Sequence, residues 1–300
     1  ALGGLGQGIA GACAFYTEFG RSLNAAPYLP AMLAIDAVLH AGRADRAEWL
    51  ERLTTGERVT APLGVSRFSV DAQNRLSGTA TAVASADVAG HVLLCGADRV
   101  VLMPLRQTGV ECSPRATWDS TRKLFDLRLS DVALDPAWIL ATGAEAQALS
   151  RRLAAHRDFA LAADAVGGAS ALLDMTVEYL QTRRQFGRPL ALFQALKHRC
   201  ADLKTMVSAA EALLDDSLAR AGDGLDTPQA TTLGLGAKAY ACTVYARVAE
   251  EALQLHGGIG MTAEHGCHLY LKRALLNEHL GRGREHYEAG IAAAFIDSAA

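Results

Sequence analysis

Positively charged side chains lie beside an aromatic ring in the segment at residues 179–203, YLQTRRQFGRPLALFQALKHRCADL. The charges are on Arg183, Arg184, Arg188 and Lys197, and the ring is that of Phe186. Guanidinium groups bind phosphate through paired hydrogen bonds, and an aromatic ring next to them suits a flat heterocycle. The segment therefore predicts a binding site for a ligand that carries both a phosphate and a heterocycle.

Two long helices that meet at a tight corner are expected to position these side chains. The pattern predicts a helix that ends near Phe186, a corner at Gly187 and Pro189, and a second helix that returns alongside the first. Apolar residues recur at helical intervals along the second helix, at Leu192, Leu196, Leu203, Met206, Ala210 and Leu213. Taken alone, the segment also fits two packed helices with solvated arginines.

A second motif, the glycine-rich run QLHGGIG at residues 254–260, makes the interpretation more specific. Together with the Arg-x-x-Phe-Gly run that starts at Arg183 and the pair Phe193–Gln194, it resembles the C-terminal domain of the flavin-dependent acyl-CoA dehydrogenases. In that family the two segments bind the pyrophosphate and adenosine end of an FAD whose flavin ring lies mainly in a neighbouring subunit. The resemblance implies FAD contacts from Arg183, Phe186, Gln194, Gln254, Gly257 and Gly258.

The expected fold is α+β, mostly α, in three parts. Residues 1–54 are similar to the later half of the family's N-terminal helical domain, in which a Gly-Gly-Leu-Gly turn precedes a helix; counterparts of its earlier helices are missing, and truncation, disorder and genuine loss stay open. Residues 55–140 predict a middle β domain, because short segments rich in β-branched residues alternate with turn residues. The strands are expected at residues 58–70, 76–83, 91–93, 99–105 and 124–129. Residues 141–300 are mainly helical, which matches a four-helix bundle.

The reaction of this family requires a carboxylate base. It removes a proton from the α carbon of an acyl-CoA thioester while a hydride leaves the β carbon for the flavin. The family's usual glutamate falls at Gly281 and its alternative position at Arg157, while the neighbouring Asp158 and Glu278 fit solvated helix charges. Asp164 interrupts an apolar run, so we expect it to lie in a pocket with a raised pKa, and it is the candidate catalytic residue.

The groups that hold the flavin ring in this family are also depleted. The nearest counterparts are TAPLGVS at residues 60–66 and VAS at residues 83–85, and neither run keeps the family's glutamate or tryptophan. The stretch between Pro62 and Gly78 is short, as if the flavin loop were trimmed. This combination is similar to one subunit of the bacterial steroid-catabolic acyl-CoA dehydrogenases, two-plus-two heterotetramers with FAD between unlike subunits.

The resemblance implies an oxidoreductase subunit for α,β-dehydrogenation of an acyl-CoA substrate such as a bulky steroid side-chain thioester. Its expected partners are FAD, an unlike acyl-CoA dehydrogenase subunit and an electron-transfer flavoprotein that accepts the electrons. Two alternatives stay open, a self-sufficient homotetramer and a catalytically silent subunit that stabilises its partner. A flavin monooxygenase on the same scaffold is a more remote one.

The bulk composition argues against several other classes of protein. The 300 residues are 50% hydrophobic, enough for a large core, and a net charge of −3 gives no field that attracts nucleic acid or an anionic membrane. No apolar run reaches the ~20 residues that span a bilayer, and no signal peptide is visible. The cysteines are scattered without CxxC spacing, which indicates a reduced, cytoplasmic protein. His265, Cys267 and His268 come nearest to a metal cluster, and we expect no metal there.

Overall fold

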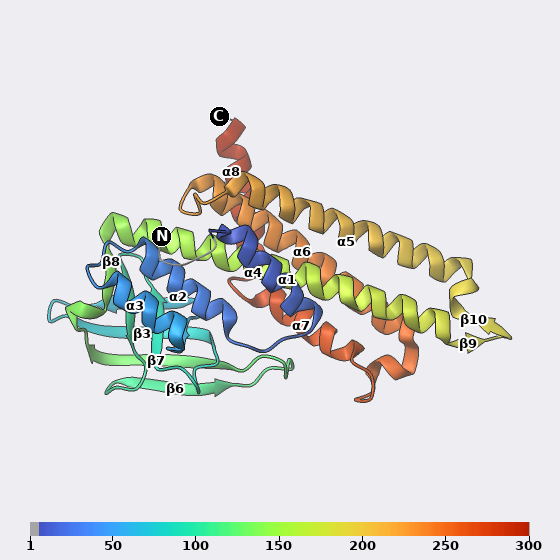
Figure 1. Cartoon of the computed structure of the whole chain (residues 1–300), viewed down its shortest axis with the longest axis horizontal. Coiled ribbons are helices and arrows are strands. Elements are labelled where there is room, and N and C mark those ends of the chain that lie inside the picture. The colour runs from blue at the N-terminus through green and yellow to red at the C-terminus, as the bar shows by residue number, and fades with distance from the viewer. Residues whose placement is uncertain (1–5, 300) are drawn as a thin grey trace.

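The structure is a computed structural model that describes residues 6–299, with side chains placed through Ile296. Residues 3–5 of the Gly-Gly-Leu-Gly turn expected before the first helix lie outside the described residues. Figure 1 shows an elongated molecule in which two β-sheets lie at one end and long helices extend away from them. The expected α+β, mostly α architecture is confirmed.

Three helices come first, one of which packs against the bundle and two of which pack against a sheet. They are α1 (Gly8–Arg21), α2 (Tyr28–His40) and α3 (Arg46–Thr55). α1 lies against the long helix α4 (Gly143–Thr182), and Gly20 and Gly167 are at the crossing. The helices α2 and α3 cover one sheet, where Leu33 and Trp49 share a core with Leu102.

The strands form two four-stranded sheets that pack face to face. One has the order β1-β4-β5-β8 and the other the order β2-β3-β7-β6. The strands are β1 (Val59–Thr60), β2 (Ser66–Val70), β3 (Arg75–Ala84), β4 (His91–Cys95), β5 (Arg99–Pro104), β6 (Val110–Arg115), β7 (Leu124–Ala133) and β8 (Ile139–Thr142), with a short 3-10 turn η1 (Pro136–Trp138) before the last. Only the β1–β4 pair is parallel among these sheet pairings. Side chains such as Leu76, Leu94, Met103 and Leu127 alternate inward and form the core between the sheets.

The C-terminal half is a bundle around α4. The other elements are the hairpin β9 (Arg184–Gln185) and β10 (Arg188–Pro189), η2 (Leu190–Leu192), α5 (Gln194–Ala221), α6 (Pro228–His256), η3 (Gly257–Met261), α7 (Cys267–His279) and α8 (Arg284–Ala299). The helix ends at Ala221 and His256 coincide with the glycine breaks in the sequence. The expected helix end near Phe186 is wrong, because α4 stops at Thr182 and the corner is a β-hairpin. Strands β6 and β8 were not expected.

One described helix, α4, is long and apolar enough to cross a bilayer by length and composition. This differs from the expectation that no segment would reach that length. In the apolar window of α4, 72% is buried inside the molecule. The burial is typical of the central helix of a bundle, because neighbouring helices rather than lipid cover its apolar surface.

A buried carboxylate ties the first helices to α4. Asp36 accepts hydrogen bonds from Arg152 Nε at 2.7 Å and from His156 Nδ1 at 2.9 Å, and the other ring nitrogen of His156 lies 3.1 Å from the hydroxyl of Tyr16. Burial alone would raise the pKa of Asp36. The hydrogen bonds from His156 and His40 and the charges of His156 and Arg152 outweigh it, so the pKa of Asp36 lies well below its ordinary value.

We expect the Asp36→Asn variant to lose less stability at low pH than at neutral pH. A lowered folded-state pKa contributes stability that is fully present above the unfolded-state value of about 4 and is lost as the pH falls below it. The difference in free energy of unfolding between wild type and variant should therefore shrink below about pH 4. Urea unfolding at a series of pH values measures it. The exposed Asp216→Asn is the matched control, and an Asp36 difference as flat as the control's would contradict the prediction.

Candidate functional site

The hairpin β9–β10 between α4 and α5 lies at the end of the bundle farthest from the sheets (Figure 1). Phe186 has a φ of +51° and is followed by Gly187 at +76°, a tight reversal that leaves the Phe186 side chain 89% exposed. The guanidinium of Arg188 lies 4.0 Å from the centre of the Phe193 ring. Arg183, which follows the last residue of α4, is also exposed. The hairpin therefore offers an unshielded ring and free charge on one surface.

Within the part of the chain that the structure describes, no carboxylate forms an ion pair with Arg183, Arg184 or Arg188. Farther along α5, Arg199 Nε donates to Glu251 Oε2 on α6 at 2.8 Å and holds the two helices together. Positive charge that the chain does not neutralise is available for an anionic ligand such as a pyrophosphate.

The glycine-rich segment forms a turn with room beside it. α6 ends at His256, Gly257 takes a φ of +63°, and a short 3-10 helix follows. Gln254, Gly257 and Gly258 are exposed, and a Cβ built on either glycine would meet nothing within 4 Å. Gly258 has no left-handed φ, so the chain's own packing does not require a glycine there. Such open backbone suits close approach of a ligand.

The two segments lie side by side although they are far apart in the sequence. Tyr179, one turn before Arg183, stacks on His256 with ring centres 4.6 Å apart, and its hydroxyl donates to the His256 carbonyl oxygen at 3.2 Å. Gln194 begins α5 at the same end. The structure therefore gathers the predicted cofactor residues at one exposed end of the bundle, where they fit the pyrophosphate and adenosine part of a dinucleotide.

The position of the expected base is filled by other side chains. A Cβ on Gly281 would overlap the hydroxyl of Tyr287 and lie 3.3 Å from Nε of Arg157. The Arg157 Nε donates to Asp158 Oδ1 at 3.0 Å, and the Tyr287 hydroxyl donates to the same oxygen at 2.9 Å. Asp158 is buried, so the expectation of a solvated helix charge is wrong for it. Glu278 is half-buried, and its carbonyl oxygen accepts from Lys238 Nζ at 3.0 Å.

Asp164 lines a cavity, as expected, but it is not poised as a base. Oδ1 lies 2.9 Å from Arg122 Nη2 and 3.0 Å from Arg273 Nη1, and Oδ2 accepts from Asn277 Nδ2 at 2.6 Å. Burial favours the neutral form, but the two guanidinium charges and the hydrogen bond from Asn277 outweigh it, so the pKa of Asp164 is lowered. The expected raised pKa is therefore wrong, because the two arginines supply the compensating charge.

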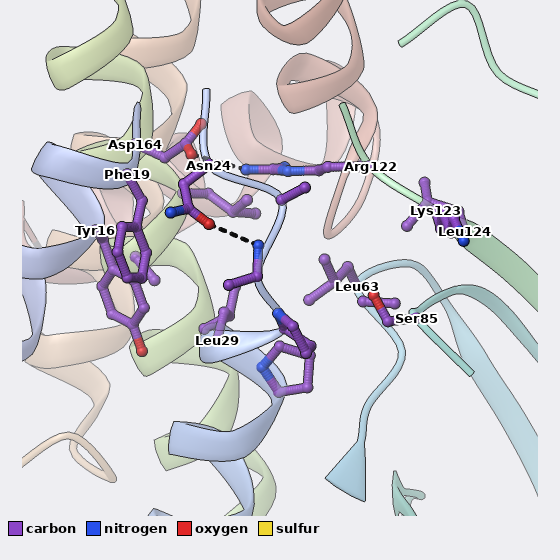
Figure 2. Close-up of a pocket in the computed structure, with 17 residues that line it drawn as sticks. Tyr16, Phe19, Asn24, Leu29, Leu63, Ser85, Arg122, Lys123, Leu124 and Asp164 are labelled. Carbon is purple, nitrogen blue, oxygen red and sulfur yellow. Dashed lines mark hydrogen bonds and ion pairs between the residues drawn. The ribbon is translucent and has the colours of Figure 1, made fainter. Parts of the chain in front are cut away.

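The ring-side region leaves little space for a flavin. The cavity beside Asp164 has a volume of ≈ 60 Å³, whereas ligand pockets measure roughly 300–1,000 Å³. Figure 2 shows Leu63 and Ser85 on one side of it and Tyr16 and Asp164 on the other. The Gly281 N–H donates to the Leu63 carbonyl oxygen, which closes the β domain onto the loop after α7. The residues present here do not fit an isoalloxazine ring.

The histidine and cysteine pattern before α7 serves local structure. The Cys267 N–H donates to His265 Nδ1 at 3.2 Å, and Cys267 is buried. Among residues 6–299, no group of three or more histidine, cysteine or acidic side chains is arranged to hold a metal ion. Two other features, the Tyr179–His256 stack and the Tyr287 hydroxyl at Gly281, could not be predicted from the sequence, because each joins residues from distant elements.

Comparison with known proteins extends over nearly the whole chain. The family model described as "Acyl-CoA dehydrogenase, C-terminal domain" matches residues 146–296. The chain is 34% identical over 273 residues to acyl-CoA dehydrogenase IpdE2 of Mycolicibacterium smegmatis, a match that covers 91% of this chain and 75% of the relative. A variant of the Tcur3481-Tcur3483 steroid ACAD is 28% identical with a TM-score of 0.86, covering 99% of this chain and 84% of that chain. The ChsE4-ChsE5 complex from Mycobacterium tuberculosis is 26% identical with a TM-score of 0.85, and the match covers 98% of this chain and 82% of that chain.

Proposed function

The chain belongs to the acyl-CoA dehydrogenase family of FAD-dependent oxidoreductases, and we propose that it lends the adenosine-side FAD contacts to an unlike partner subunit. One observation carries the proposal. The predicted adenosine-side residues share one open end of the bundle, while the same chain's ring side is reduced to a cavity of ≈ 60 Å³ and its base position holds Arg157 and Tyr287. A chain equipped for half of the dinucleotide site needs a partner that holds the other half.

In this proposal the residues of the bundle end bind and orient the nucleotide tail. Arg183 would pair with the pyrophosphate, Phe186 would offer its ring to the adenine, and Gln194 and Gln254 would donate amide hydrogen bonds. Gly257 and Gly258 let the backbone approach closely. The bound FAD supplies the hydride acceptor at its flavin ring, and the unlike subunit supplies the carboxylate that takes the α proton. Asp164 is then an ion-paired structural residue and not the base.

The proposed substrate is the CoA thioester of a bulky, steroid-derived acyl chain, which acquires an α,β double bond. The similarity to a steroid ACAD and to a complex of two named subunits supports this choice. A two-plus-two heterotetramer is the proposed assembly. An electron-transfer flavoprotein is the proposed acceptor of the electrons.

The test is to produce the chain with and without the acyl-CoA dehydrogenase subunit encoded next to it. We expect a yellow complex with equal amounts of both subunits and dehydrogenase activity, and a colourless product from this chain alone. A yellow, active protein made of this chain only would overturn the proposal in favour of the homotetramer. Absorbance near the flavin band and the subunit ratio of the purified material give the answer.

Within that complex, Arg183→Ala is expected to weaken FAD binding by about 1.5–3 kcal/mol, or roughly 10- to 150-fold, because a charge-assisted contact to phosphate is lost. Arg128 is exposed on strand β7, and Arg128→Ala is the matched control that should leave FAD affinity unchanged. FAD titration of the apo complex, followed by fluorescence, measures both variants. Unchanged affinity in Arg183→Ala would favour the catalytically silent assembly subunit.

A further inference from the structure

Three rings are packed together directly behind the two segments that form the proposed FAD-tail site. Tyr179 on α4 stacks on His256 at the end of α6, with ring centres 4.6 Å apart and an angle of 25° between the planes. His265, from the loop before α7, lies 4.5 Å from His256 at 51°. The stack joins side chains from α4, α6 and the loop before α7.

The backbone links this stack to both halves of the site. The Tyr179 carbonyl oxygen accepts from the Arg183 N–H at 2.8 Å, and the Arg183 carbonyl oxygen accepts from the Leu190 N–H at 2.8 Å, so the hairpin is tied to the last turn of α4. On the other side, the Tyr179 hydroxyl donates to the carbonyl oxygen of His256, the residue immediately before Gly257. Tyr179 is therefore linked to the arginine segment through its backbone and to the glycine turn through its side chain.

The His256 ring is held in one orientation, and a backbone hydrogen bond sets its tautomer. Its Nδ1 lies 2.8 Å from the Ala252 carbonyl oxygen, which can only accept, so Nδ1 carries the proton. Burial chiefly lowers the pKa of His256, with a smaller contribution from the neighbouring His265. The ring is 3% exposed, and among the described residues its Nε2 has no hydrogen-bond partner. A buried polar atom left without a partner is rare enough to require an explanation, and retention of a flat, neutral ring for stacking supplies one.

We propose that Tyr179 and His256 form a positioning pair that sets the distance between the Arg183 hairpin and the Gly257–Gly258 turn, so that both reach the same dinucleotide tail. This inference rests on the proposed function of the bundle end. The pair touches no reacting atom and acts only through the segments on either side of it. It assigns a role in cofactor affinity to two residues that lie behind the binding surface.

The test compares three tyrosine variants in the purified complex, with FAD as the probe. Tyr179→Phe keeps the stack and removes one hydrogen bond, so FAD affinity should fall roughly 2- to 10-fold. Tyr179→Leu removes the stack and the hydrogen bond, and FAD affinity should fall on the order of 10- to 100-fold. Tyr270→Phe is the matched control, because the Tyr270 hydroxyl also donates to a backbone oxygen, that of Arg21, at 2.6 Å but away from the site. It should lower the melting temperature without changing FAD affinity.

Affinity is measured by FAD titration of the apo complex, and turnover is measured at saturating FAD. We expect turnover to recover at saturating FAD in both Tyr179 variants, which a general loss of structure would not allow. FAD affinity in Tyr179→Leu equal to wild type, while Arg183→Ala weakens it, would overturn the positioning role and leave the proposed function in place. FAD affinity unchanged in both Tyr179→Leu and Arg183→Ala would overturn the positioning role and the proposed function together. If Tyr179→Leu fails to fold, Tyr179→Phe and His256→Phe test the positioning role instead. FAD affinity unchanged in both of these variants would overturn it.

Discussion

Replacing Arg273 by methionine is expected to lower the free energy of unfolding by about 3–5 kcal/mol, the largest effect of any single substitution considered. The Arg273 side chain is fully buried on α7. Its Nε lies 3.2 Å from Asp119 Oδ2 and its Nη1 lies 3.0 Å from Asp164 Oδ1. A methionine fills much of the same volume but removes the charge. Two buried carboxylates would then share the one remaining guanidinium, that of Arg122.

The cost arises from unpaired buried charge, and a second substitution tests that cause. Arg273→Met combined with Asp119→Asn should recover part of the lost stability, because an amide needs no counter-charge. Arg75→Met is the surface control, since its ion pair with Asp131 is exposed and should contribute less than about 1 kcal/mol. Chemical unfolding followed by circular dichroism measures all three. A loss in Arg273→Met as small as that of the control would show that the buried cluster contributes little.

The same cluster determines how the β domain sits against the bundle. Asp119 and Arg122 belong to the loop before β7, Asp164 lies on α4, and Arg273 and Asn277 lie on α7. Asn277 completes the set, because its Oδ1 accepts from Arg122 Nη1 at 2.7 Å. These contacts hold the sheets close to the helices and leave only the small cavity of Figure 2. The arrangement stabilises the chain where a flavin ring would otherwise require space.

The candidate cofactor segments could be proposed from the sequence because the residues of each lie close together, and their binding of FAD stays a prediction. Arg183, Phe186 and Gln194 lie within one short run, Gly257 and Gly258 lie within another, and the two runs together carry the resemblance to the family. The hairpin conformation was not predictable in this way. Glycine and proline signal a change of direction, but they do not distinguish a helix corner from the two short strands that form here.

Asp164 shows why the electrostatics of the site could not be read from the sequence. Its apolar neighbours along α4 suggested burial, which is confirmed, and burial alone would raise its pKa. The two arginines that reverse the shift come from a loop and from a different helix, and Arg273 is 109 positions away.

Strand β6 was missed for a different reason. It is an edge strand whose residues are mostly exposed and include Pro114, so it lacks the alternating apolar pattern.

Gly167→Ala is expected to lower the free energy of unfolding by about 3 kcal/mol, at the upper end of the usual cost of overpacking. A Cβ at Gly167 would overlap the Thr17 carbonyl oxygen on α1, and one at Gly20 would overlap the Asp164 carbonyl oxygen on α4. Each overlap is with rigid backbone, so no side chain can rotate to relieve it. The two helices would have to separate.

Gly236→Ala on α6 is the matched control for this prediction. A Cβ there meets nothing within 4 Å, so alanine should raise stability by about 0.5–1 kcal/mol through its better helix propensity. Thermal and urea unfolding of both variants provide the comparison. Equal gains in the two variants would mean that α1 moves away from α4 at little cost. A loss confined to Gly167→Ala would confirm that α1 cannot move away from α4 without a cost in stability.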